Sequence, residues 1–372
     1  MAAVWIILII ISLLLMILLH ESGHYFAAKS VGIKVEQFSI GFGREIVGWD
    51  RGETRYSIKW FPFGGSTKIC GMNPDEELSE EDRPRSYGEA TAWKRAVVVV
   101  AGSAVHFVVA FILLYLVFWP IGLKTQEPVK AARLFEVQKT VTDSRGVKVP
   151  APGYQAGLKK GDTVIGVDGK TIRTWDDFRK SISRQAGRTV TLKVRRDGET
   201  FSLVAKPVKS RDGIGILGVA VETKNVTERS NPITAVWGSV KGVGYLTAAM
   251  FKALFSITTW KKIIGVTPRG NQGPVSIVGG ARLAYESRTL GVSVFLFVIA
   301  EIYIAVAIFN LLPLPPLDGG FLLVILIEVI FRRKIDLRKL VPITVVVIVI
   351  LSLLAIRLII LDIVKPIRIT GF

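Results

Sequence analysis

Residues 4–24 read VWIILIIISLLLMILLHESGH, an apolar run that ends in His20-Glu21-Ser22-Gly23-His24. Such a run predicts a membrane-crossing helix, because about 20 apolar residues are needed to span ~30 Å of hydrocarbon. Two histidines four residues apart lie on one face of a helix and can bind the same tetrahedral metal ion. The glutamate between them can reach a water molecule on that metal. The stretch therefore predicts a metal-dependent peptidase motif within or beside a bilayer.

The same five-residue pattern also occurs by chance on helices that bind no metal. Composition argues against chance here, because the chain has only three histidines and two of them, His20 and His24, form the pair. Ionisable side chains inside a membrane are costly unless they are paired or functional. A Zn²⁺ site is therefore the preferred interpretation.

The composition indicates several membrane spans. Half of the 372 residues are hydrophobic and the mean hydropathy is +0.45, which is too apolar for a single soluble core. The segments of suitable length are 3–19, 96–119, 290–312 and 341–360. The first is not expected to be a signal peptide, because it lacks a basic leader and the histidine motif stands where a cleavage site would be.

Residues 233–264 interleave aromatic side chains with lysines, including Lys241 and Lys252 near the middle. This pattern favours an amphipathic helix on the membrane surface, within an interfacial region 231–289. A fifth crossing is the alternative. It would invert the later spans and put Asp318 on the opposite side of the membrane from His20.

Charge predicts the orientation. Residues 20–95 carry 11 Lys and Arg and residues 320–340 carry five, whereas the residues before the first span carry none. The positive-inside rule then puts both segments in the cytoplasm and both termini outside, in an inner (cytoplasmic) membrane with the active site near its cytoplasmic side. Residues 121–289 hold 29 Lys and Arg against 13 Asp and Glu, but long domains translocate largely regardless of charge. Anionic lipid headgroups or acidic partners suit this charge, and nucleic acid is not expected.

The loop 31–95 is predicted to be β-rich and membrane-associated. Residues 44–49 and 54–61 are β-prone and flank Asp50-Arg51-Gly52-Glu53, which is a hairpin signal. Glycines bracket the hairpin and indicate either a packing device or a β-edge that holds an extended substrate beside the active site. The acidic run 75–82 is expected to be a solvated loop.

Residues 126–207 show Ala156-Gly157-Leu158, Gly161-Asp162 and Asp168-Gly169, then a helical stretch 174–185 and strands 189–195 and 200–205. This order resembles a PDZ domain of the bacterial protease type. The resemblance implies peptide binding by strand addition, and a β-rich spacer without a ligand is the alternative. Cys70 is the only cysteine, so no internal disulfide is expected.

A catalytic zinc site needs a third protein ligand and an open position. The candidates in or beside the spans are His106, Glu301 and Asp318. Asp318 lies within the sequence NLLPLPPLDGG of residues 310–320, where prolines and glycines would break the helix and let a carboxylate turn toward the metal. With four spans, Asp318 also lies on the same side of the membrane as His20.

At this point the chain resembles the site-2 protease family of intramembrane metalloproteases, in particular its bacterial members with one PDZ domain, the regulator-of-sigma protease type. The resemblance rests on five stretches: HESGH at 20–24, FSIGFG at 38–43, PFGG at 62–65, GPV at 273–275 and 310–320. It implies zinc bound by His20, His24 and Asp318, with Glu21 as general base. It also implies cleavage of single membrane-spanning helices, usually after a first cut elsewhere. Regulated intramembrane proteolysis of anti-sigma factors, or clearance of signal-peptide remnants, would be the biological role.

One stretch departs from the family pattern. Relatives commonly show Gly-Pro-x-x-Asn early in the second span, whereas this chain has Gly102-Ser103-Ala104-Val105-His106. His106 is either a packed histidine, a contact to substrate or to groups around the metal, or a rival ligand to Asp318. Glu301 is expected to pair within the bundle or to cap a polar path. Asn310 is expected to hydrogen-bond an unwound substrate.

The expected fold is a polytopic α-helical membrane protein with four transmembrane helices, a membrane-associated β-hairpin, and an α+β PDZ domain inserted between spans 2 and 3. The PDZ domain is expected to be extracytoplasmic and to gate substrate, by binding a peptide or by excluding bulk. The expected boundaries are 1–30, 31–95, 96–119, 126–207, 231–289, 290–320 and 341–361. The rivals are a non-enzymatic PDZ membrane adaptor with a vestigial metal site, and a metal-binding transporter or sensor. The latter is disfavoured because nothing suggests inverted repeats.

Overall fold

The computed structural model describes residues 2–73, 75–128, 132–210, 213–221, 223–266 and 273–367. The chain forms two units, one made of residues up to 123 and from 228, the other of residues 124–227. Residues 129–131 of the predicted PDZ range and 267–272 of the predicted interfacial range lie outside the described residues.

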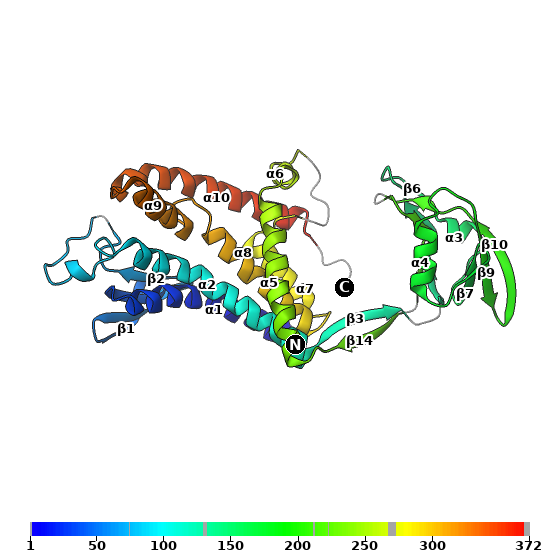
Figure 1. The fold of residues 1–372 in the computed structure, drawn as a ribbon, viewed down its shortest axis with the longest axis horizontal. Coiled ribbons are helices and arrows are strands. Elements are labelled where there is room, and N and C mark those ends of the chain that lie inside the picture. Colours follow the sequence, from blue (N-terminus) through cyan, green and yellow to red (C-terminus); the bar gives the residue numbers. More distant parts are fainter. Residues whose placement is uncertain are drawn as a thin grey trace. The chain divides into compact units, whose positions relative to one another are not determined.

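The first unit is mainly helical (Figure 1). Its first helix, α1 (Ala2–Ser30), carries the whole histidine motif and continues beyond it. The helical elements that follow are η1 (Arg83–Arg85), α2 (Ala92–Leu116), the π-helical turn η2 (Val117–Ile121), α5 (Pro232–Leu254), α6 (Ile257–Ile264), α7 (Ile277–Ser287), α8 (Val292–Asn310), α9 (Asp318–Phe331), η3 (Leu337–Leu340) and α10 (Val341–Val364). Within the described residues, four helical segments are long and apolar enough to cross a membrane: Ala3–Ser30, Ala92–Ile121, Val292–Asn310 and Leu337–Val364. They correspond to the four segments predicted from the sequence.

The predicted hairpin lies between the first two of these helices, with longer strands than expected. β1 (Val35–Arg51) and β2 (Thr54–Ile69) pair antiparallel, from Arg51↔Thr54 at the turn to Phe38↔Thr67 near the base. In a second set of partners, from Gln37↔Arg55 to Ile40↔Ile58, the residue numbers of both segments increase together. These two segments therefore run in the same direction. The distal half of the hairpin therefore folds back onto the proximal half, and residues 64–69 become an outer strand.

Glycines make this fold-back possible. Gly41 and Gly43 both have φ of +88°, and Gly64 has φ of +126°, values that glycine adopts without the strain of a Cβ atom. A Cβ on Gly41 would also lie 2.6 Å from the carbonyl oxygen of Phe61 on the opposing strand. The glycines that bracket the hairpin in the sequence are thus the points at which it bends.

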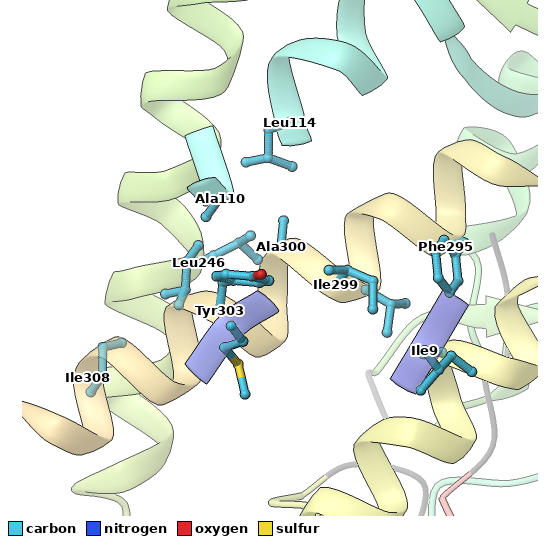
Figure 2. Close-up of a cluster of buried hydrophobic side chains, with 13 residues drawn as sticks. Ile9, Ala110, Leu114, Leu246, Phe295, Ile299, Ala300, Tyr303 and Ile308 are labelled. Atoms are coloured by element: carbon cyan, nitrogen blue, oxygen red, sulfur yellow. The ribbon is translucent and has the colours of Figure 1, made fainter. Parts of the chain in front are cut away.

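A large hydrophobic core joins five of the helices of this unit (Figure 2). Its buried members come from α1, α2, α5, α7 and α8, as illustrated by Ile9, Leu114, Leu246 and Tyr303. Protein interiors pack as densely as organic crystals, so a core of this kind fixes the helices relative to one another. The histidine motif and His106 lie on α1 and α2, which this core holds together.

The third span, α8, ends at Asn310, and the helix breaks within the stretch 310–320, where the prolines and glycines predict a break. α8 ends at Asn310 and α9 begins at Asp318, with Pro313, Pro315 and Pro316 in between. Proline lacks a backbone N–H and clashes with the preceding turn, so the helix cannot continue through this segment. Residues 320–340 were assigned to the cytoplasm by charge, but 320–331 are helical and the basic residues follow the end of α9.

The predicted surface helix over 233–264 consists of two helices, α5 and α6, bent by 61° at the break between them. α5 is not solvated on all sides, because Ala235, Ser239 and Leu246 are buried. Figures 1 and 2 both show α5 running across the direction of α8 rather than alongside it. By length and composition alone the bent pair would also qualify as a fifth span.

The second unit is a small α+β structure. Its four-stranded sheet has the order β10-β9-β7-β8, and α4 (Trp175–Ser183) begins with a capping box between Thr174 and Asp177. Phe178 of α4 and Leu192 of the sheet are buried in its core. The remaining elements are α3 (Pro152–Gln155), β3 (Leu123–Pro128), β4 (Leu134–Val137), β5 (Thr140–Thr142), β6 (Lys148–Pro150), β7 (Thr163–Val167), β8 (Lys170–Thr171), β9 (Val190–Arg196), β10 (Glu199–Ala205), β11 (Val208–Lys209), β12 (Gly215–Ile216), β13 (Val219–Val221) and β14 (Thr223–Glu228).

This unit is longer than the predicted range 126–207. The helix and the two strands predicted within the range correspond to α4, β9 and β10. However, β13 pairs with β4, and β14 pairs with β3. Residues beyond 207 therefore complete the structure, because strands at its start find their partners there.

Candidate metal centre

Three side chains from distant parts of the sequence converge at one point of the first unit. The Nε2 atoms of His20 and His24 lie 3.2 Å apart, and Oδ2 of Asp318 lies 3.4 Å from the first and 3.5 Å from the second. Within the described residues these three form the group with ligand atoms close enough to share a metal ion. Tetrahedral zinc with ligands at about 2.0–2.1 Å requires ligand atoms about 3.3 Å apart. The triangle therefore fits three corners of a zinc tetrahedron, with the fourth corner left for water or substrate.

The second helix orients His24. The Nδ1 atom of His24 donates to the carbonyl oxygen of Val98 in α2 at 2.8 Å. A hydrogen bond at Nδ1 fixes the tautomer and leaves Nε2 free to bind a metal, as is common for metal-binding histidines. α2 therefore contributes to the centre without supplying a ligand.

Gly102 makes room for both imidazole rings. A Cβ atom at Gly102 would collide with Nε2 of His24 and would lie 2.8 Å from Cε1 of His20. Gly23 of α1 likewise faces the backbone of α2, where a Cβ would lie 2.6 Å from the carbonyl oxygen of Ala101. The two helices can approach this closely only because glycine occupies the contact.

Asp318 reaches the histidines because α9 starts at that residue. The start of the helix packs closely against the proline-containing loop. A Cβ on Gly319 would therefore collide with the carbonyl oxygens of Leu311 and Leu312. The Oδ2 atom of Asp318 is buried and has no hydrogen-bond partner. Burying an unsatisfied carboxylate oxygen is costly, and a bound metal ion would satisfy it.

The other end of α9 is fixed to α2 by a buried ion pair. Nη2 of Arg95 lies 2.6 Å from Oε2 of Glu328, and the two side chains are only 11% and 7% exposed. The other oxygen of Glu328 accepts from the backbone N–H of Ile335 at 2.8 Å. α9 is thus held at both ends, which fixes the position of its first residue.

Glu21 is contacted from the folded hairpin. The hydroxyl of Thr67 in β2 donates to Oε2 of Glu21 at 2.8 Å. Nothing in the sequence pattern singles out Thr67, because the contact depends on where the fold-back of the hairpin puts its outer strand.

His106 lies against the centre but outside the ligand group. Its ring stacks on His20 with centroids 5.1 Å apart and an interplanar angle of 18°, and it makes a T-shaped contact with Tyr303 with centroids 5.4 Å apart. His106 is 1% exposed, and neither ring nitrogen has a hydrogen-bond partner. Asp318, rather than His106, completes the triangle with His20 and His24.

The other two polar candidates are less directly involved. Asn310 is the last residue of α8 and is half-buried at the start of the break that leads to Asp318. Glu301 is half-buried in the middle of α8. Neither belongs to the group that could share a metal ion within the described residues.

The fold and the site together define a membrane-embedded metallopeptidase, and comparison with known proteins specifies which kind. The model of peptidase family M50 matches residues 8–354. Zinc metalloprotease Rip1 of Mycobacterium tuberculosis is 29% identical over 98% of both chains. A Clostridium perfringens protein, described as a candidate zinc metalloprotease, is 30% identical over 95% of this chain and 96% of its own length. Among solved structures, the PDZ domain of an SdrC-like protein from Listeria monocytogenes covers 26% of this chain and 93% of its own, at 15% identity and a TM-score of 0.21.

The chain belongs to peptidase family M50. It is an intramembrane zinc metalloprotease and a multi-pass membrane protein, which confirms the predicted family, activity and cofactor. The adaptor and transporter alternatives are therefore rejected.

Proposed function

We propose that His20, His24 and Asp318 are the zinc ligands and that Glu21 is the general base. The observation that carries this proposal is the triangle of ligand atoms, with edges of 3.2, 3.4 and 3.5 Å. Bound zinc supplies a Lewis acid for the scissile carbonyl and activates water at neutral pH. Glu21, on the same helix as both histidines, accepts the proton of the attacking water and passes it to the leaving amine.

The test pairs a zinc measurement with a cleavage assay on a model transmembrane peptide. Glu21→Gln should keep its zinc and lose cleavage, because the amide retains the shape of the side chain but cannot accept the proton. A Glu21→Gln variant that cleaves at the normal rate would sink the assignment of the base.

The centre is proposed to lie toward the cytoplasmic side of an inner membrane. His20 follows Ala3 by a helical distance of about 25 Å, and the hydrocarbon core is ~30 Å thick. α5 runs across the direction of α8, and α6 carries Lys261 and Lys262. Both features suit a position of α5 and α6 at the outer membrane surface, which would leave four spans. This orientation puts residues 31–95 in the cytoplasm and residues 124–227 outside.

Sidedness can be tested with single cysteines, because the native Cys70 is buried. A cysteine at Glu80 should react with a membrane-impermeant maleimide only after lysis, and a cysteine at Lys170 should react in intact cells. The reverse pattern would overturn the orientation.

We propose that the outer strand of the folded hairpin, residues 64–69, holds the substrate in extended form. Those residues pair with β1 on one side, and the strand runs past Glu21. Strand addition would expose the scissile peptide, which a helical substrate hides. N-methylation of successive substrate residues should then lower kcat/KM at alternate positions, and a uniform effect would argue against strand pairing.

The second unit is proposed to be a PDZ-type gate for substrates with a single membrane span. A pocket of about 310 Å³ lies between α4 and residues 214–219, with Arg179 on its wall. An extended peptide end would suit this groove, with the guanidinium available to a terminal carboxylate. Trimmed substrates would pass the gate, and anti-sigma factors or signal-peptide remnants cut elsewhere are the class that fits.

Replacing residues 132–221 with a short flexible linker should permit cleavage of untrimmed substrates. Arg179→Ala should slow the cleavage of trimmed substrates only if a peptide end is read, because exclusion by bulk does not need the guanidinium. Unchanged selectivity in both variants would make the unit a spacer.

His106 and Asn310 are proposed to shape the site around the substrate. The stacked ring of His106 holds His20 in its plane, which favours a packing role over a direct substrate contact. Asn310, at the break in the third span, would donate to a carbonyl of the unwound substrate. Asn310→Ala should raise KM while kcat is largely kept, and an unchanged KM would remove Asn310 from the substrate site.

A further inference from the structure

The carboxylate of Glu21 has a hydrogen-bond donor that comes from another element. The hydroxyl of Thr67 lies 2.8 Å from Oε2 of Glu21 and 3.1 Å from its backbone oxygen. A threonine hydroxyl has a single proton, and the ionised carboxylate is the stronger acceptor. Within the described residues, this is the one hydrogen bond that the carboxylate of Glu21 accepts.

The strand is shaped for this approach. Gly65 lies two residues before Thr67, so both residues face the same side of β2. A Cβ at Gly65 would lie 2.9 Å from Cγ of Glu21 and 3.3 Å from Cγ2 of Ile17. Glycine at 65 therefore lets the strand come close to α1, and threonine at 67 supplies the donor at that distance.

The opposite face of the strand is tied into the sheet. The hydroxyls of Ser66 and Ser39 lie 2.9 Å apart, so the outer strand is anchored to β1 one residue away from Thr67. The position of Thr67 is thus set by the sheet and not by α1. Glu21 is held between its own helix and an independently anchored strand.

We propose that Thr67 is a positioning residue that orients the carboxylate of Glu21 for proton transfer. The hydrogen bond occupies Oε2 and leaves Oε1 to accept the proton of the attacking water. The terminal torsion of a glutamate is broad, so without this bond the carboxylate samples orientations that do not face the water. The inference rests on the proposed role of Glu21 as general base.

The experiment uses the full-length protein and a model transmembrane peptide, with kcat, KM, zinc content and thermal stability measured for each variant. Thr67→Val removes the hydroxyl and keeps the shape, and kcat should fall about 10- to 100-fold, as is typical when a partner that orients an active-site group is lost. KM and zinc content should stay near their original values. Thr67→Ser retains the hydroxyl and should recover most of the lost kcat.

Thr54→Val is the matched control. Thr54 lies in the same sheet and its hydroxyl donates to the carbonyl oxygen of Val35 at 2.8 Å, away from Glu21. Thr54→Val makes the same chemical change as Thr67→Val, and the Thr54→Val enzyme should keep its kcat even if the sheet is less stable. Thr67→Ala serves as a second deletion of the hydroxyl, should valine distort the strand.

Three outcomes would overturn the proposal. One is an unchanged kcat in Thr67→Val, another is a failure of Thr67→Ser to recover activity, and the third is a loss of zinc or folding in both hydroxyl deletions. If Glu21→Gln is inactive and Thr67→Val is normal, only the positioning role fails. If Glu21→Gln is active, the assignment of the base fails.

Discussion

The metal centre and the unit of residues 124–227 are built in opposite ways. The centre brings Asp318 to His20 and His24 across nearly 300 positions of sequence, and its geometry depends on helix contacts at Gly23 and Gly102. The second unit is built over shorter sequence distances: β9 and β10 are adjacent in the chain as well as in the sheet, and Leu134 of β4 pairs with Val221 of β13. A local change in the packed helices should therefore disturb zinc binding, whereas a change in the second unit should leave it intact.

The largest effect is expected from Asp318→Asn. A neutral amide removes the negative ligand from the triangle, so zinc content and cleavage should both fall to near background. Metal analysis of the purified variant is the measurement. Full zinc occupancy in this variant would show that the ligand comes from elsewhere.

A large effect is also expected from Gly102→Ala, although this residue binds nothing. The added methyl group would meet the imidazoles of both histidines, so zinc affinity should fall about 10- to 100-fold, as is usual when the support of a ligand is lost. Gly244→Ala is the control, since a Cβ there meets no atom within 4 Å. Competitive chelation measures both. Equal affinities would mean that α1 and α2 are not as closely packed as the geometry indicates.

An intermediate effect is expected at His106. His106→Phe keeps an aromatic ring against His20 and should preserve most of the zinc affinity. His106→Leu removes the stacking and should weaken it, by roughly 0.5–1.5 kcal/mol as for other aromatic pairs. If His106→Phe loses more zinc affinity than His106→Leu, the centre needs the ring nitrogens of His106 rather than the stacking.

The smallest effect on the centre is expected from Phe178→Ala. This side chain is 2% exposed in the core of the second unit, so its removal should destabilise that unit by about 3–5 kcal/mol. Limited proteolysis should then cut within residues 132–221, while zinc content remains unchanged. A loss of zinc would show that the two units are energetically coupled.

Much of this protein could be predicted from local patterns. The apolar run before His20, the turn at Asp50-Arg51-Gly52-Glu53 and the helix at 174–185 all follow from residue types at fixed spacings, which act over one element at a time. The family also follows, because its motifs are short and contiguous. The prolines of 310–320 predicted the break after the third span, but α9 was not predicted, because residues 320–340 were assigned to the cytoplasm by charge alone.

The amino-acid sequence by itself determined the spans, the hairpin and the histidine pair, because each is encoded in a short stretch, and it left Asp318 as one of three candidates for the third ligand. Only the tertiary structure decided that Thr67 faces Glu21, that Gly102 makes room for the imidazoles and that His106 stacks on His20. These contacts join elements far apart in the chain, and their geometry depends on how closely α1, α2 and the folded hairpin pack. No spacing rule along one strand or helix contains that information.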